Sequence, residues 1–241
     1  MMKMLTFAGT SHIGKVRKDN QDRFLTRSLS DEVGFAVVCD GMGGANGGSV
    51  ASTMATETIA EILLRDYRGE QTDEEIDALL IRSCAAANAE IFRRSQREAE
   101  LEGMGTTAVI ALVCKNKAHI LHVGDSRAYR LSGGALSQIT SDHSMVQELI
   151  DSGEITAEAA KTHPQKNIIT RAVGVDGFIT CDCDTVPFEE GDILLLCTDG
   201  LTNMVSDKEI GKLAGKKDPE RLVNAALNAG GNDNITVVLI Y

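Results

Sequence analysis

Three aspartates in this chain each stand beside an apolar stretch and have glycine as a close neighbour. Asp40 ends an apolar run and opens a glycine-rich loop that reaches Gly48, Asp199 follows LLLCT and precedes glycine, and Asp233 follows GGN before a second apolar run. A carboxylate beside a buried strand is costly unless positive charge meets it, and glycine lets the backbone approach a ligand closely. A glycine-rich turn explains any one segment, but the recurrence indicates a metal site.

A fourth aspartate, Asp125, lies in its own Gly-Asp loop, and all four candidates offer only oxygen donors. Oxygen ligands suit Mg²⁺ or Mn²⁺ better than Zn²⁺, and Mg²⁺ usually takes few protein carboxylates. Two neighbouring ions can stabilise both oxygens of a displacement at phosphorus. A calcium-binding EF-hand loop is excluded because the acids are scattered through the chain.

Two residues of the polar loop before the second predicted strand are further candidates. Arg17 suits a phosphate clamp because a guanidinium pairs with two phosphate oxygens at once, although most loop arginines are solvated surface residues. Asp22 suits the ordering of a water beside a metal, and it suits a turn equally well. The residues alone leave both alternatives open.

Composition excludes several classes of partner. The 241 residues carry a net charge of −11 and no dense Lys/Arg cluster, so nucleic acids and anionic membranes are not expected partners. The same charge repels phosphate, so phosphate chemistry would need local positive charge. No run reaches membrane-span length and no signal peptide is evident. The six cysteines lie mostly in apolar runs, and we expect a reduced, soluble, cytoplasmic protein.

The pattern of apolar residues predicts strand hairpins interrupted by helix pairs, hence one α+β domain over residues 1–241. A capping box at Thr72 and Glu75 opens a helix expected to continue to about Glu100. Ser206 is expected to cap a short helix, and Asp218 the last one. Strands are predicted at 4–11, 23–27, 33–40, 106–114, 118–123, 128–131, 135–139, 182–187, 192–197 and 235–240; the other helices are predicted at 51–65, 144–152 and 156–161.

Eight short motifs occur in a fixed order along almost the whole chain. They are RKDNQD (17–22), VVCDGMGG (37–44), MGTT (104–107), VGDSR (123–127), SDHS (141–144), RAVG (171–174), CTDGL (197–201) and GNDNITV (231–237). In this register the chain resembles the metal-dependent protein phosphatase family (PPM, the protein phosphatase 2C type) in its compact bacterial form.

The resemblance implies a four-layer αββα sandwich, in which two antiparallel sheets are flanked by helix pairs, with a flap at about 144–167. It implies a phosphatase that hydrolyses phosphoserine and phosphothreonine in proteins with a metal-bridging water and opposes bacterial Ser/Thr kinases. A monomer is expected. By position, Asp40, the Gly41 carbonyl, Asp199 and Asp233 would bind two central Mn²⁺ or Mg²⁺ ions. Asp125 would hold a third ion with Asp199, Arg17 would bind phosphate and Asp22 would order water.

One position departs from many members of the family. They carry histidine after the D-G pair, often taken as the acid for the leaving group, and here that residue is Met42. A thioether cannot donate a proton, so the acid must be another group, such as a metal-bound water. His143 is interpreted as local structure and not as the acid.

Three other functions stay open on the sequence. One is a sporulation-type or stress-regulatory phosphatase that acts on one dedicated partner. A catalytically silent phosphoprotein-binding module on the same fold would not need the full set of acids and Arg17. A small-molecule phosphomonoesterase would differ in the depth of its pocket, which the sequence does not show.

Overall fold

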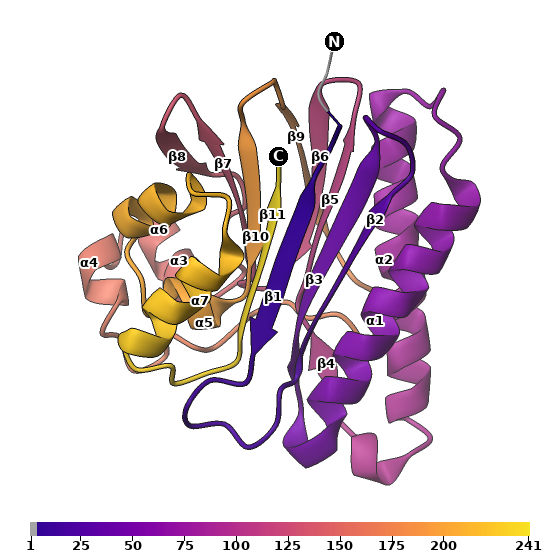
Figure 1. Ribbon diagram of the computed structural model, residues 1–241. Helices are drawn as coiled ribbons and strands as arrows, with labels where there is room; N and C mark the ends of the chain where they lie inside the picture. The colour runs from indigo at the N-terminus through magenta and orange to yellow at the C-terminus, as the bar shows by residue number, and fades with distance from the viewer. Residues whose placement is uncertain (1–3) are drawn as a thin grey trace.

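The computed structural model describes residues 4–241, and two antiparallel sheets form its centre (Figure 1). One sheet orders its five strands β1-β11-β10-β7-β8. The other orders β2-β3-β5-β6-β9, with the short β4 beside β3. The strands of the first sheet are β1 (Phe7–His12), β7 (Arg127–Ser132), β8 (Ala135–Gln138), β10 (Ile193–Cys197) and β11 (Ile235–Ile240); those of the second are β2 (Asp22–Ser28), β3 (Gly34–Met42), β4 (Gly105–Thr106), β5 (Ala108–Cys114), β6 (Lys117–Val123) and β9 (Asp182–Pro187).

Helices cover the outer face of each sheet, as Figure 1 shows. The long helices α1 (Gly44–Asp66) and α2 (Asp73–Ser95) pack together against the second sheet, and the single 3₁₀ turn at Ala99–Leu101 follows them. The first sheet is covered by α5 (Asp199–Thr202), α6 (Asp207–Ala214) and α7 (Pro219–Asn228). Two short helices, α3 (Met145–Asp151) and α4 (Ala157–Ala160), lie between β8 and β9 in the chain. The predicted four-layer αββα sandwich is confirmed.

Alternation along the central strands explains why the layers stack. In β3, Phe35 and Val37 face α1 and α2, whereas Ala36 and Val38 face the other sheet. Strand β11 divides its apolar side chains between the helices and the second sheet in the same way. Because each sheet is covered on both faces, its central strands, such as β5, β10 and β11, read as nearly continuous apolar runs, whereas the edge strands do not. Each large side chain that is fully buried here contributes about 1.5–3 kcal/mol.

Helix termini follow the sequence signals with three exceptions. Helix α1 begins at Gly44, inside the predicted glycine-rich loop, and not at the predicted residue 51. Thr72 and Glu75 form the predicted capping box, and Asp218 caps α7 with Pro219 in its first turn. The prediction that the Ser206 side chain caps α6 is wrong, because Ser206 occupies the N-cap position but its side chain makes no capping bond. Helix α2 also ends at Ser95, and not at about Glu100.

Within residues 4–241, no helix has both the length and the apolar character needed to cross a membrane. The single domain over 1–241 and the flap at 144–167 stay predictions. The chain from 144 to 169 does close on itself at its base, where an isolated bridge pairs Ser144 with Ile169.

Candidate active site

The predicted site residues converge on one cavity of about 740 Å³. Of the predicted residues, only Asp22 is not part of its lining. The lining includes six predicted residues, Arg17, Asp40, Gly41, Asp125, Asp199 and Asp233. Folding therefore brings together carboxylates from four distant segments.

Asp40 is held firmly through its backbone near the end of β3. Its N–H donates to Thr107 Oγ1 (2.9 Å), and its carbonyl accepts from Thr107 N–H (2.8 Å) and from Thr106 Oγ1 (2.8 Å). Burial raises the pKa of the Asp40 carboxyl well above its usual range, and the charge of Asp22 raises that pKa further. The backbone bonds thus fix a carboxyl group that the surrounding protein makes hard to ionise.

Gly41 lies where β3 meets the first turns of α1. Its N–H donates to the Gln21 carbonyl (3.2 Å). A Cβ at this position would collide with the Gly48 carbonyl and would come within 2.7 Å of the Gln21 carbonyl. Glycine is therefore required by the close approach of two backbone segments, which the sequence signalled by its glycine-rich loop.

Asp22 lies directly opposite Asp40 in the β2–β3 pairing and is 1% exposed. Its Oδ2 accepts from Thr198 Oγ1 (2.9 Å) and from Thr236 Oγ1 (2.7 Å). Its Oδ1 is buried and has no hydrogen-bond partner among the described residues. Burial raises the pKa of Asp22 to about 7 despite the two hydroxyl donors. An acceptor left without a partner is where an ordered water fits best.

Asp199 and Asp125 are also hard to ionise. Asp199 starts α5 and accepts from Asn203 Nδ2 (2.8 Å) at its Oδ2. Burial raises its pKa to about 6, with a further contribution from Asp233. Burial raises the pKa of Asp125 to about 8, and the charges of Asp199 and Asp142 act in the same direction.

Asp233 forms an ion pair with Arg17, which among residues 4–241 is the one cationic side chain that pairs directly with a candidate acid. Arg17 Nη2 donates to Asp233 Oδ2 (2.7 Å), and Asn234 N–H donates to Asp233 Oδ1 (2.8 Å). The Arg17 side chain stays 55% exposed, so it borders the cavity and also reaches solvent. The bond to Asp233 and the charges of Asp40 and Asp199 raise the pKa of Arg17, which stays charged.

The donor set fits divalent cations. Acidic side chains that raise one another's pKa values lack positive charge between them, and one arginine at the edge does not balance four acids. The available donors are carboxylate and carbonyl oxygens, which hard ions such as Mg²⁺ and Mn²⁺ prefer.

Sequence reasoning missed Asn234, which connects the loop before β2 to the Asp233 segment. Its Oδ1 accepts from Gln21 N–H (2.8 Å), and its Nδ2 donates to the Ile13 carbonyl (2.9 Å) and the Asp19 carbonyl (3.0 Å). The side chain is 5% exposed. No local signal could have found it, because its partners are backbone groups of a distant loop.

Comparisons with known proteins show the family of the chain. A family model described as Protein phosphatase 2C matches residues 8–234. The serine/threonine phosphatase stp of Listeria monocytogenes serotype 4b is 40% identical over 232 residues, covering 94% of this chain and 92% of that protein. The protein phosphatase PhpP of Streptococcus pneumoniae serotype 2 is 39% identical over 236 residues, covering 95% of this chain and 94% of that protein.

Solved structures show the same likeness. The serine/threonine phosphatase of S. agalactiae superposes with a TM-score of 0.91 at 34% identity, covering 98% of this chain and 99% of that one. The catalytic domain of the phosphatase PstP in complex with two manganese ions superposes with a TM-score of 0.81 at 35% identity, covering 98% and 97%. Fold, cavity and likenesses together define a protein phosphatase. The chain belongs to the protein phosphatase 2C family.

Proposed function

We propose that this chain removes phosphate from phosphoserine and phosphothreonine in proteins at the carboxylate-lined cavity, using Mn²⁺ or Mg²⁺. It is a metal-dependent serine/threonine phosphatase, in keeping with its family and its relatives. The convergence of Asp40, Asp125, Asp199 and Asp233 on one cavity carries the proposal. A silent binding module has no use for such a costly set of buried acids, so this alternative is not favoured.

In this proposal Asp40, the Gly41 carbonyl, Asp199 and Asp233 hold two central ions, and Asp125 with Asp199 holds a third. Bound divalent ions supply positive charge that draws in phosphate and lowers the pKa of water. The protein's own part is to fix the ligands in advance. The three bonds to the Asp40 backbone and the Asn203 bond to Asp199 do this.

Arg17 is proposed to bind the phosphate. A guanidinium has five N–H groups, so its bond to Asp233 leaves other donors for phosphate oxygens. Asp22 is proposed to hold a water, because its buried Oδ1 has no partner among residues 4–241.

Two features bear on the leaving group and on access. Met42 lines the cavity, and a thioether cannot protonate the leaving alkoxide, so a different group does so. Asn167, Ile168 and Ile169 also line the cavity. We propose that the segment at 144–167 is a flap beside the cavity, next to the entrance for the protein substrate.

Phosphorylated proteins are the substrates, and we further propose bacterial Ser/Thr kinases and their targets as partners. The bacterial relatives named serine/threonine phosphatase and protein phosphatase support this. We also propose a monomer in the cytoplasm. The six cysteines are all free, as expected of a reducing compartment.

The proposal is tested by steady-state kinetics on a phosphothreonine peptide with Mn²⁺, comparing the wild type with Arg17→Ala. The wild type is expected to release phosphate, and this release should stop when EDTA is added. Arg17→Ala should raise KM by about 10–100-fold, the value of one or two charged hydrogen bonds, with a smaller change in kcat.

Lys15→Ala is the matched control, because it also removes one positive charge from the same loop but does not line the cavity. It should leave KM within about twofold of the wild type, since exposed charges act weakly. If the wild type releases no phosphate with either metal, the proposed function is wrong. If Arg17→Ala and Lys15→Ala behave alike, Arg17 does not bind the phosphate.

A further inference from the structure

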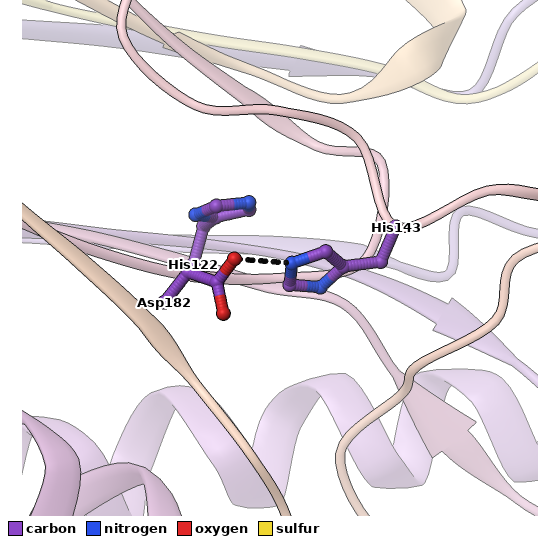
Figure 2. Close-up of side chains that lie close together, drawn as sticks. All are labelled: His122, His143 and Asp182. Carbon is purple, nitrogen blue, oxygen red and sulfur yellow. Dashed lines mark hydrogen bonds and ion pairs between the residues drawn. The ribbon is translucent and has the colours of Figure 1, made fainter. Parts of the chain in front are cut away.

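A second group of potential metal ligands, His122, His143 and Asp182, lies outside the lining of the candidate active site (Figure 2). His122 comes from β6, His143 from the loop before α3, and Asp182 from the start of β9. One ligand atom from each lies within 4.8 Å of the others. His122 and His143 are stacked with their ring centroids 4.5 Å apart.

The hydrogen bonds at His143 do not fit a metal ion. Its Nδ1 accepts from Gly124 N–H (3.2 Å), so a neutral ring carries its proton on Nε2, which faces Asp182 Oδ2 (3.1 Å). A ligating nitrogen must be free of its proton. Arg171 Nη1 is itself a donor and lies 3.1 Å from the same nitrogen, so its positive charge disfavours a metal cation there. Burial lowers the pKa of His143, which agrees with a neutral, hydrogen-bonded ring.

The contacts of His143 join the turn that carries Asp125 to the base of the 144–169 segment. Its N–H donates to the Gly124 carbonyl (2.9 Å), so the main chain and the ring of His143 together hold both polar groups of Gly124. Its carbonyl accepts from Thr170 N–H (2.9 Å). Its ring shares Asp182 with Arg171, whose Nη1 donates to Asp182 Oδ1 (2.8 Å). His143 is 6% exposed, so its contacts with Gly124 are buried, whereas Asp182 and Arg171 also reach solvent.

The turn at Gly124 depends on this support. Gly124 has φ +101°, and a Cβ there would come within 2.6 Å of the Thr107 side chain. The backbone of Gly124 therefore adopts a conformation that few other residues adopt, and Asp125 follows it directly in the chain. Loss of the ring would leave the Gly124 N–H without its acceptor, at the residue that sets the direction of Asp125.

We propose that His143 is a positioning residue that ties the Gly124–Asp125 turn to both ends of the 144–169 segment and so sets the affinity of the ion held by Asp125. The inference rests on the proposed function, in which Asp125 is a metal ligand. It assigns His143 no contact with substrate and no proton transfer. Residues that orient a ligand typically change metal affinity by about 10–100-fold when they are replaced.

Equilibrium Mn²⁺ binding to the full chain, followed by electron paramagnetic resonance, tests this with two conservative variants. The amide oxygen in His143→Asn can replace Nδ1 as the acceptor for Gly124 N–H. The longer side chain in His143→Gln can replace the Nε2 donor to Asp182 but loses the Gly124 bond. The weakest Mn²⁺ site should lose about 10–100-fold in affinity in His143→Gln and less than about threefold in His143→Asn, with the tighter sites unchanged.

Three controls make the result interpretable. Asp125→Ala identifies the weakest site by removing it, and His163→Ala removes a histidine of the same segment that makes no contact with Gly124. Amide hydrogen exchange of the metal-free protein gives a readout independent of metal. The Gly124 amide should exchange faster in His143→Gln than in the wild type or in His143→Asn.

The outcomes separate the inference from the proposed function. If the wild type binds Mn²⁺ and His143→Gln binds every ion with unchanged affinity, the inference alone is overturned. Equal weakening in His143→Gln and His143→Asn, with equal exchange at Gly124, overturns it too. A wild type that binds no Mn²⁺ contradicts the proposed function and the inference together.

Discussion

Asp40→Asn is expected to lower kcat/KM for a phosphothreonine peptide by about a thousandfold or more, because it removes a ligand charge from the centre of the site. The same change should raise the melting temperature of the metal-free protein at pH 7.5. Burial and the charges of Asp22 and Asp199 hold the pKa of the Asp40 carboxyl well above its usual range, so a neutral amide relieves a cost that the folded protein bears.

Asp31→Asn serves as the control, since it makes the same chemical change at an exposed position away from the cavity. It should alter neither activity nor the melting temperature of the metal-free protein. Activity and thermal denaturation are measured on the same preparations. An Asp40→Asn protein that keeps more than about a tenth of the wild-type kcat/KM would contradict a role for this carboxylate at the metal centre.

The melting temperature of the metal-free protein is expected to fall by roughly 5 °C or more between pH 5 and pH 8. Asp22, Asp125 and Asp199 have pKa values raised to about 7, 8 and 6, against about 3.9 in an unfolded chain. A carboxyl with a raised pKa contributes stability at pH below about 4 that is lost as the pH rises through its folded value. The loss therefore runs from about pH 4 to about pH 8, and most of it falls above pH 5.

Mn²⁺ should reverse this loss. An ion at a hundred times its dissociation constant stabilises the fold by about 2.7 kcal/mol, or about 5–10 °C for a chain of this size. The gain should be larger at pH 8 than at pH 5, where protons compete with the metal for the carboxylates. Differential scanning calorimetry with and without Mn²⁺ at both pH values measures it. If the melting temperature of the metal-free protein rises from pH 5 to pH 8, the buried acids do not dominate the pH dependence of folding stability.

The parts of the site that sequence predicts are those with a local signature. Asp40, Asp199 and Asp233 each follow or precede an apolar strand, and Gly41 stands in a glycine-rich loop. Residue types and neighbours single them out, whereas the four-layer fold was expected from the resemblance of the eight motifs to a known family. The β11 bounds and the Thr72 capping box were predictable for the same reason, because a few neighbouring residues determine them.

What sequence did not predict depends on contacts between distant segments. The buried state of Asp22 arises from Thr198 and Thr236, which lie 176 and 214 residues away in the chain. Nothing near Asp22 distinguishes it from a turn residue. Asn234 and His143 likewise gain their roles from backbone groups of other loops. Helix α5 was missed because four residues are too few to show helical periodicity.

Anomalous diffraction from a crystal of this protein grown with Mn²⁺ gives the most direct view of the metal centre. We expect two peaks in the cavity beside Asp40, the Gly41 carbonyl, Asp199 and Asp233, and a weaker third peak beside Asp125. No peak is expected between His122, His143 and Asp182. A cavity without manganese, in a crystal where the ion binds between those histidines, would contradict the assignment of the aspartates as the metal ligands.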